Sequence, residues 1–428
     1  MKTSCSSSPV KVRMGLRRFV TFVVVVLVIY LIAVAYVFFF AGPSPSRRDV
    51  AKARAGLYQS WCNETGDAYE AFKELARERG WRMYVSTYEG PPVVRGLTTI
   101  GRLECGESIY VPLYQPQTGR SIETVAAFRG GQTAFIECTR ARRSWWRRTK
   151  PRHLELGVLY SDGSLTKLQL PDMQIVSHLA IGNRCVFFCD FFERLWLYDI
   201  QEETLREVQR PEGWEGIAGT IGMLADRFLF ILSTRDVLHV VRSTAPYAEV
   251  SRIAGVSEML LVGERIIIEK DDTCFLYNTE SGGTEHLTPG KLVAPLGQNE
   301  FLFCGRDTSY PAYTRCTLNL YDIAARSQQV FWQPPKEDGG FRVKPGKEKY
   351  YDYAKLILSP DRRFLFVPRE IPAYRTAESL MVFEYNVFDL GSGEKRGSFL
   401  TIHEGQFCFE FLGWDTGDQG ARPAVPRP

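Results

Sequence analysis

Basic and aromatic side chains gather in one segment of this sequence, residues 139–152. The segment reads TRARRSWWRRTKPR and contains seven arginines and lysines, no acidic residue and a pair of tryptophans. Arginine offers planar, bidentate donors to a carboxylate or phosphate, and tryptophan offers a flat face to sugars or to a membrane interface. These residue types therefore indicate recognition of an anion. The candidate binding residues here are Arg142, Arg143, Trp145, Trp146, Arg147 and Arg148.

Two later segments, residues 305–315 and 368–379, combine arginine with tyrosine in the same way. Their candidate binding residues are Arg306, Tyr310, Tyr313, Arg369, Tyr374 and Arg375. Two other interpretations of residues 139–152 stay open. The segment could be a solvated run of charge, although a double tryptophan is costly to leave in water. It could also dock the domain against an anionic leaflet, at about 1 kcal/mol per basic residue.

Motifs for catalysis and for metal binding are missing from the sequence. There is no GxSxG, HExxH or P-loop, and the five histidines are scattered. We therefore expect no catalytic residues, no metal and no cofactor. The net charge of only +4 gives no reason to expect a nucleic-acid partner. One alternative stays open, a hydrolase or lyase for an acidic glycan or peptide. It would use Asp190, Arg235, Asp271 and Asp307.

The elements that must position these segments follow a repeat. Between residues 125 and 367, an apolar run, a tight polar turn and a second apolar run recur six times. A third strand follows each, and four of them end in Asp or Asn: Asp199, Asn278, Asp322 and Asp389. The third strands are marked by Tyr160, Tyr198, Val241, Tyr277 and Tyr321, at spacings of 38, 43, 36 and 44 residues. A four-stranded unit that recurs about every 40 residues is typical of a β-propeller blade.

One of these turns carries a resemblance to known proteins. Residues 358–365, LSPDRRFL, are similar to the SPDG turn of the β-propeller superfamily, in its WD40-like and TolB-like forms, with Arg362 where glycine is usual. The resemblance covers residues 93–415 and identifies no specific family. It implies an all-β fold of about seven four-stranded blades, with six or eight as alternatives. It also implies that the loops between second and third strands, which include all three candidate segments, open on one rim.

The two ends of this region predict how the ring closes. Residues 409–415 read as an inner strand with no blade after it, and residues 93–122 contain strands that precede the first complete repeat. Joining them would remove the open sheet edge. Residues 43–92 are expected to form a linker with an amphipathic helix at 67–79, which Gly80 would cap. Residues 416–428 are expected to be a disordered tail.

An apolar segment near the N-terminus predicts a membrane anchor. Phe19 to Gly42 contains no charged residue. At about 1.5 Å per residue it spans roughly 36 Å, enough for a bilayer core of about 30 Å. We expect a single-pass signal-anchor, with residues 1–18 in the cytoplasm and the propeller in a periplasmic, extracellular or luminal space. Cleavage after Ala35 is the alternative. The expected partners are this membrane and another protein or an anionic glycan or lipid.

Two covalent features complete the sequence predictions. Cys304 and Cys316 flank a predicted hairpin and form a candidate disulfide, with buried thiols as the alternative. Asn63 begins an Asn-Glu-Thr sequence, which is an acceptor for N-glycosylation in organisms that glycosylate.

Overall fold

The computed structural model describes eleven stretches of the chain. These are residues 24–30, 47–88, 98–127, 131–139, 153–171, 176–190, 192–304, 317–332, 356–371, 382–403 and 407–416. The chain divides into two compact units, Met1–Val50 and Ala51–Pro428. In the first unit, residues 24–30 are helical, and the rest of the predicted anchor, Phe19 and Gly42 included, lies outside the described residues. Within the described stretches, no helix has both the length and the apolar character needed to cross a bilayer.

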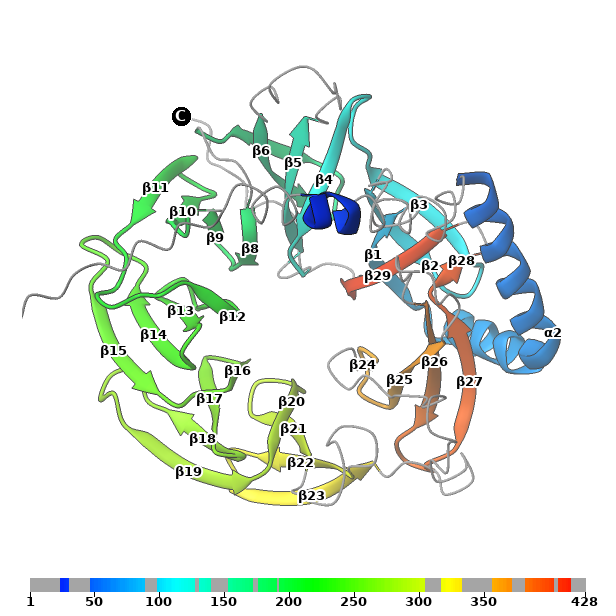
Figure 1. Ribbon diagram of the computed structural model, residues 1–428. Helices are drawn as coiled ribbons and strands as arrows, with labels where there is room; N and C mark the ends of the chain where they lie inside the picture. Colours follow the sequence, from blue (N-terminus) through cyan, green and yellow to red (C-terminus); the bar gives the residue numbers. More distant parts are fainter. Residues whose placement is uncertain are drawn as a thin grey trace, which may run out of the picture. The chain divides into compact units, whose positions relative to one another are not determined.

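The strands of the second unit form seven antiparallel sheets around a ring (Figure 1). Six sheets have four strands that are consecutive in the chain, and we call them blades 1 to 6. Blades 1 to 3 are formed by β4 (Arg120–Val125), β5 (Gln132–Thr139), β6 (Leu154–Tyr160) and β7 (Leu165–Gln169); by β8 (Val176–Ile181), β9 (Cys185–Asp190), β10 (Leu195–Asp199) and β11 (Thr204–Val208); and by β12 (Ile217–Leu224), β13 (Phe228–Ser233), β14 (Val237–Arg242) and β15 (Glu249–Ala254).

Blades 4 to 6 continue the ring in the same order. They are formed by β16 (Glu258–Val262), β17 (Arg265–Lys270), β18 (Thr273–Tyr277) and β19 (Thr284–Pro289); by β20 (Lys291–Pro295), β21 (Glu300–Cys304), β22 (Leu318–Asp322) and β23 (Ser327–Trp332); and by β24 (Ile357–Leu358), β25 (Phe364–Ile371), β26 (Val382–Asp389) and β27 (Lys395–Leu400). The protein is therefore a seven-bladed, all-β propeller, as its repeat predicts.

Burial within a blade explains why the repeat is visible in the sequence. Every residue of β9 and of β26 is buried, whereas β7 and β15 alternate between exposed and partly buried positions. The second and third strands lie between two neighbouring sheets, so both of their faces contact apolar side chains. For example, Ile136 and Val158 of blade 1 share a core cluster with Phe188 of blade 2. The outermost strands lie at the periphery (Figure 1), and β7 and β15 among them have exposed positions, whereas β27 is buried from Gly397 to Leu400.

The seventh sheet, which we call the closing blade, combines both ends of the propeller sequence. Its strands are β28 (Ile402–His403), β29 (Phe407–Trp414), β1 (Arg82–Tyr88), β2 (Thr98–Glu104) and β3 (Ile109–Tyr114), in that order. The pairing of β29 with the early strands confirms the predicted closure. The ring begins earlier than residue 93, because β1 lies in the range that the sequence assigned to a linker and helix. Its residues RMYVSTY directly follow a helix and have polar positions that conceal the strand.

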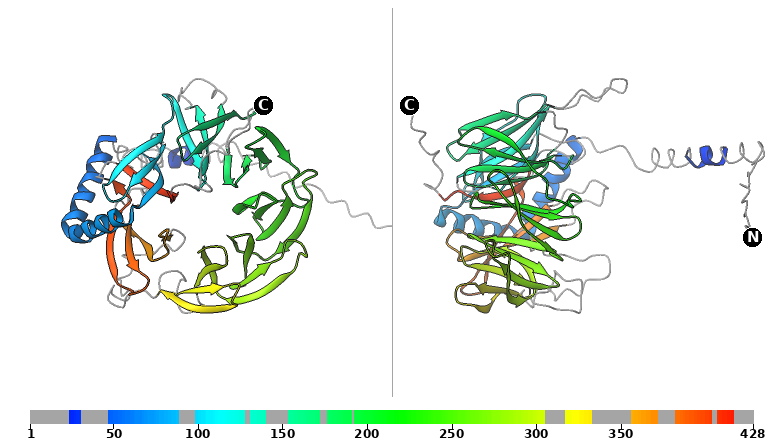
Figure 2. Two further views of the ribbon diagram at one scale, coloured as in Figure 1. Left: turned by 180° about the vertical axis from the view of Figure 1, so that it is seen from behind. Right: turned by 90° about the vertical axis from the view of Figure 1, so that its left-hand side faces the viewer.

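The helix α2 (Arg47–Arg79) lies outside the ring beside β3 and β27 (Figures 1 and 2). It contains the predicted helix and has non-helical backbone angles at Thr65. Phe72 stacks on Phe399 of blade 6, with 4.5 Å between ring centroids. Gly397 makes this approach possible, because a Cβ there would lie 2.8 Å from the backbone nitrogen of Phe72. Gly80 has a φ of +61°, as expected of the residue that ends the helix.

Candidate functional site

The binding rim is the rim formed by the loops between second and third strands together with the linkers between blades. Antiparallel strand order places all of these on the same side of the ring. Most of the predicted binding residues lie outside the described residues, as does Cys316. They are Arg142, Arg143, Trp145, Trp146, Arg147, Arg148, Arg306, Tyr310, Tyr313, Tyr374 and Arg375. The candidate that the structure describes is Arg369.

Arg369 neutralises a carboxylate inside its own blade. It lies on β25 opposite Glu384 of β26, and its Nη2 is 2.6 Å from Oε2 of that glutamate. Glu384 is buried. A buried charge without a partner would be costly, so this guanidinium has a structural role whether or not it also contacts a ligand.

Asp190, a residue of the enzyme alternative, is the centre of a similar arrangement at the end of β9. Its buried carboxylate accepts hydrogen bonds from the backbone nitrogen of Arg194 (2.9 Å), from Nε of Arg194 (2.8 Å) and from Nε1 of Trp196 (3.3 Å). The Arg194 guanidinium also lies over the ring of Trp196 and over that of Phe192. Phe192 is 50% exposed. The acid therefore holds a rim turn in place and presents an aromatic side chain to solvent.

A third carboxylate cluster lies between blade 1 and the closing blade. Oε2 of the buried Glu137 accepts hydrogen bonds from Tyr114 Oη (2.8 Å), Lys167 Nζ (2.5 Å) and Arg120 Nη1 (3.3 Å). Glu155 also contacts Arg120 and Lys167. Sequence reasoning missed this cluster, although two glutamates in otherwise apolar strands were a usable signal.

These contacts determine the proton affinities of the cluster. The hydrogen bond from Arg120 holds the pKa of Glu155 below its usual value, although burial opposes this. Burial favours a lower pKa for Lys167, but the hydrogen bond to Glu137 and further contacts outweigh burial and raise it. A carboxylate with a lowered pKa is a poor proton donor near neutral pH, and a lysine with a raised pKa is a poor base. The cluster is therefore better suited to holding two blades together than to acid–base catalysis.

The other residues of the enzyme alternative do not join Asp190. Arg235 is largely exposed and pairs with Glu215. Asp271 lies in a two-residue turn of blade 4, with a φ of +50°. Asp307 lies outside the described residues. Across the described parts of the chain, no group of three or more His, Cys, Asp or Glu side chains could hold a metal ion.

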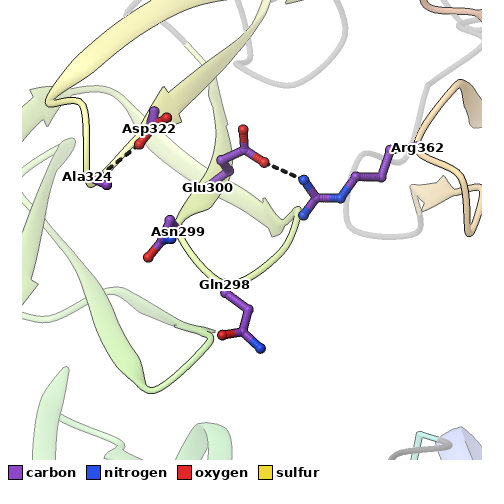
Figure 3. Close-up of a pocket in the computed structure, with 6 residues that line it drawn as sticks. All are labelled: Gln298, Asn299, Glu300, Asp322, Ala324 and Arg362. Carbon is purple, nitrogen blue, oxygen red and sulfur yellow. Dashed lines mark hydrogen bonds and ion pairs between the residues drawn. The ribbon is translucent and has the colours of Figure 1, made fainter. Parts of the chain in front are cut away.

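The opposite rim is formed by the turns between first and second strands and between third and fourth strands. It contains a cavity of about 330 Å³ between blades 5 and 6 (Figure 3). Its lining residues are Gln298, Asn299, Glu300, Asp322, Ala324 and Arg362. Arg362 Nη1 donates to Glu300 Oε2 at 2.6 Å across the two blades.

The structure describes Cys304 and Asn63, but it does not describe both residues of the candidate disulfide. Cys304 is buried at the end of β21, and its predicted partner lies outside the described residues. Asn63 is exposed on α2 and accepts a hydrogen bond from Gln59 Nε2 at 3.1 Å. The disulfide and the glycan stay predictions.

Comparisons with known proteins find similarity in fold alone. No family model matches the chain, and no curated protein does. Solved structures with this fold share 9–13% identity with it. The C-terminal WD40 domain of Sif2 is 11% identical over 69% of this chain and 76% of that chain, with a TM-score of 0.42. TolB from Acinetobacter baumannii is 12% identical over 58% and 62%, with a TM-score of 0.33. Protein lmo1340 from Listeria monocytogenes EGD-e is 9% identical over 73% and 90%, with a TM-score of 0.45. The sheet topology identifies the chain as a seven-bladed β-propeller, and the comparisons add no narrower family.

Proposed function

We propose that this protein is a membrane-anchored binding platform whose binding rim takes an anionic partner outside the cytoplasm. The anchor is the apolar segment from Phe19 to Gly42. The ligand-binding groups are the arginines and aromatic residues of segments 139–152, 305–315 and 368–379.

The observation that carries this proposal is that the buried carboxylates near the binding rim are already paired with arginines of their own blades. Glu137, Asp190 and Glu384 are buried, and each already contacts a cation of its own blade. The seven basic residues of segment 139–152 come in addition to these pairs, and the segment contains no acid of its own. An excess of positive charge beside aromatic rings suits a carboxylate- or phosphate-bearing partner.

The fold supports the same proposal, since a closed ring of sheets is a rigid base for long loops. In blades 1 and 2, the loop between the second and third strands connects two strands that are almost entirely buried. Binding residues are found disproportionately on such loops. A binding platform can use such loops on a rigid base, and it requires no catalytic group.

Binding to defined anions tests the rim. Full-length protein would be compared with a variant in which Arg142, Arg143, Arg147 and Arg148 become Ser and both tryptophans become Ala. The probes are vesicles of phosphatidylserine in phosphatidylcholine, polygalacturonate and a poly-glutamate peptide. We expect salt-sensitive binding of at least one probe by the wild type, and its loss in the variant.

The matched control changes Arg227 and Arg326 to Ser, since both are exposed on the opposite rim. It should bind as the wild type does. Equal binding by all three proteins would contradict a role of segment 139–152 in binding. The absence of binding to every probe would contradict the proposal of an anionic partner.

Membrane anchoring is tested separately. Full-length protein should stay in the membrane pellet after alkaline carbonate extraction, whereas a variant without residues 19–42 should be released. Release of both proteins would contradict the anchor and leave the rim proposal intact.

A further inference from the structure

The linker between blades 2 and 3, residues 209–216, connects β11 to β12 on the binding rim (Figure 1). We call it the strap. Three polar contacts hold it to its neighbours: Arg210 with Glu193, Glu215 with Arg235, and the carbonyl oxygen of Glu212 with Arg252 Nη1. Two of these contacts are ion pairs between exposed side chains, which contribute little to stability in water. The polar contacts alone therefore hold the strap only weakly.

Trp214 is the apolar anchor of the strap. Its side chain packs against the core cluster between blades 2 and 3, and its ring centroid lies 5.6 Å from that of His239 on β14. Gly213 and Gly216, on either side of it, have φ of +70° and +104°, a region that favours glycine. The strap can therefore turn at both ends of the short segment that carries the indole.

His239 is completely buried beneath this indole, and one of its ring nitrogens has a partner. Nδ1 lies 2.5 Å from Oε1 of Glu249 on the neighbouring strand β15. Because a carboxylate accepts, Nδ1 carries a proton, and a neutral imidazole then has an accepting Nε2. Among the residues that the structure describes, the buried Nε2 of His239 and the buried Nε1 of Trp214 have no hydrogen-bond partner. An acceptor and a donor thus lie on neighbouring rings, and they are complementary only while His239 is neutral.

The charges around His239 act in opposite directions. Glu249 favours a positive imidazole, whereas Arg252 lies directly opposite His239 in the register of β15 and disfavours it. The other charged or titratable groups on the elements packed around it are Arg210, Glu212 and Glu215 of the strap, Cys185 and Cys189 of β9, and Tyr247 of the turn before β15. On the other side of β14, the residue opposite His239 is the apolar Ile231. The absence of an acceptor for Nε2 within the described residues therefore becomes decisive.

We propose that protonation of His239 releases the strap, so that acid opens the binding rim between blades 2 and 3. A proton on Nε2 makes this atom a donor, and Trp214 Nε1 facing it is a donor as well. A buried, charged N–H group without an acceptor is costly, and water can supply the acceptor once Trp214 moves away. The closed strap is therefore favoured at neutral pH and is lost as the pH falls. The inference holds whether or not the proposed anionic partner is correct.

Hydrogen–deuterium exchange of the full-length protein, measured by peptide mass spectrometry, tests the strap. Exchange of residues 209–216 would be compared at about pH 7.5 and about pH 5.5, across the range in which histidine changes its charge, after correction for the intrinsic effect of pH. We expect the corrected exchange rate to rise about tenfold or more in acid, since an unsatisfied buried donor costs enough for such a change. Residues 284–289 of the outer strand β19 serve as the internal reference and should not change.

Three variants identify the titrating group. His239→Gln removes the titration and keeps an accepting amide oxygen, so its strap should exchange at the same corrected rate at both pH values. Glu249→Gln removes the charge that favours a positive imidazole, so release of the strap should require a lower pH than in the wild type. His286→Gln is the matched control, because His286 is exposed on β19, and it should behave as the wild type does. Melting curves at neutral pH would confirm that each variant folds.

A strap whose corrected exchange is the same at both pH values in the wild type would overturn the proposal. A rise that persists unchanged in His239→Gln would also overturn it, since another group would then control the strap. If His239→Gln does not fold, Glu249→Gln decides, because release at the same pH as in the wild type would exclude His239. A rise spread over all blades would indicate general acid unfolding and would contradict a local release.

Discussion

Thr87 of β1 lies opposite Phe409 of β29, so the first and last long strands of the propeller are neighbours in one sheet. Their pairing runs from Met83 opposite Trp414 to Tyr88 opposite Cys408. It closes the ring through strand pairing and removes the sheet edges that an open ring would expose.

Closure should depend on the buried face of β1. Val85 has no exposed surface and belongs to the cluster that joins the closing blade to blade 6. Val85→Asp places an unpaired charge there and should lower the free energy of unfolding by about 4 kcal/mol or more. Val330→Asp is the control, because this valine is 59% exposed on the outer strand β23. Urea unfolding would measure both, and similar losses would contradict the assigned role of β1.

The contact between α2 and blade 6 should tolerate no side chain at Gly397. A Cβ there would lie 2.8 Å from the carbonyl oxygen of Ala68, so Gly397→Ala must push the helix away from Phe399. We expect a loss of about 1–3 kcal/mol, typical of overpacking. Gly66→Ala changes the same residue type where no atom lies within 4 Å, and it should be neutral or stabilising. Thermal unfolding compares the two, and a neutral Gly397→Ala would show that the helix is not tightly held.

Acid should weaken the junction between blade 1 and the closing blade through Glu155. Arg120 holds the pKa of this glutamate below its value in the unfolded chain. A lowered pKa stabilises the fold above the unfolded value of about 4.3, and this contribution is lost as the pH falls through the folded value. Glu155→Gln should therefore lose less stability than the wild type between pH 7 and pH 3, in urea titrations at each pH.

The control for this pH dependence is Glu280→Gln, since Glu280 is an exposed carboxylate in the turn after Asn278. It should follow the wild type at every pH. If Glu155→Gln follows the wild type as well, the Arg120–Glu155 pair does not contribute to acid sensitivity.

The reactivity of cysteine thiols should differ between helix α2 and the blades. Burial raises the pKa of Cys185 and of Cys274 to about 12, so very little thiolate forms at pH 7.5. Cys62 on α2 is only partly buried. Alkylation followed by peptide mass spectrometry should find Cys62 modified first and the two blade cysteines modified only after unfolding. Fast modification of Cys185 in native protein would mean that blade 2 opens locally.

The blades could be predicted because their inner strands are buried on both faces and therefore form long apolar runs. The second and third strands of blade 2, CVFFCD and LWLYD, are the clearest example. β1 could not be predicted, since its apolar face is completed only by β29 from the far end of the sequence. Composition identified the segments rich in arginine and aromatic residues.

The sequence was less informative about pairs of charges. Arg369 and Glu384 meet through the register of two strands, which composition does not reveal. Asp190 and Arg194 are only four residues apart across a tight turn, and that spacing was a usable signal of pairing. A charge near a rim can therefore be assigned to a ligand only after its strand partner is known.

The order of synthesis gives the closing blade one further consequence. Strands β1 to β3 leave the ribosome first and must wait for β29 before their sheet is complete. At about 5–20 residues per second, the more than 300 residues between the end of β1 and the start of β29 take roughly 15–65 s to translate. During that interval the unpaired edge of β1 and the buried face around Val85 are open to wrong partners. A folding factor that shields β1 to β3 during this interval would raise the yield of folded protein without contacting any other blade.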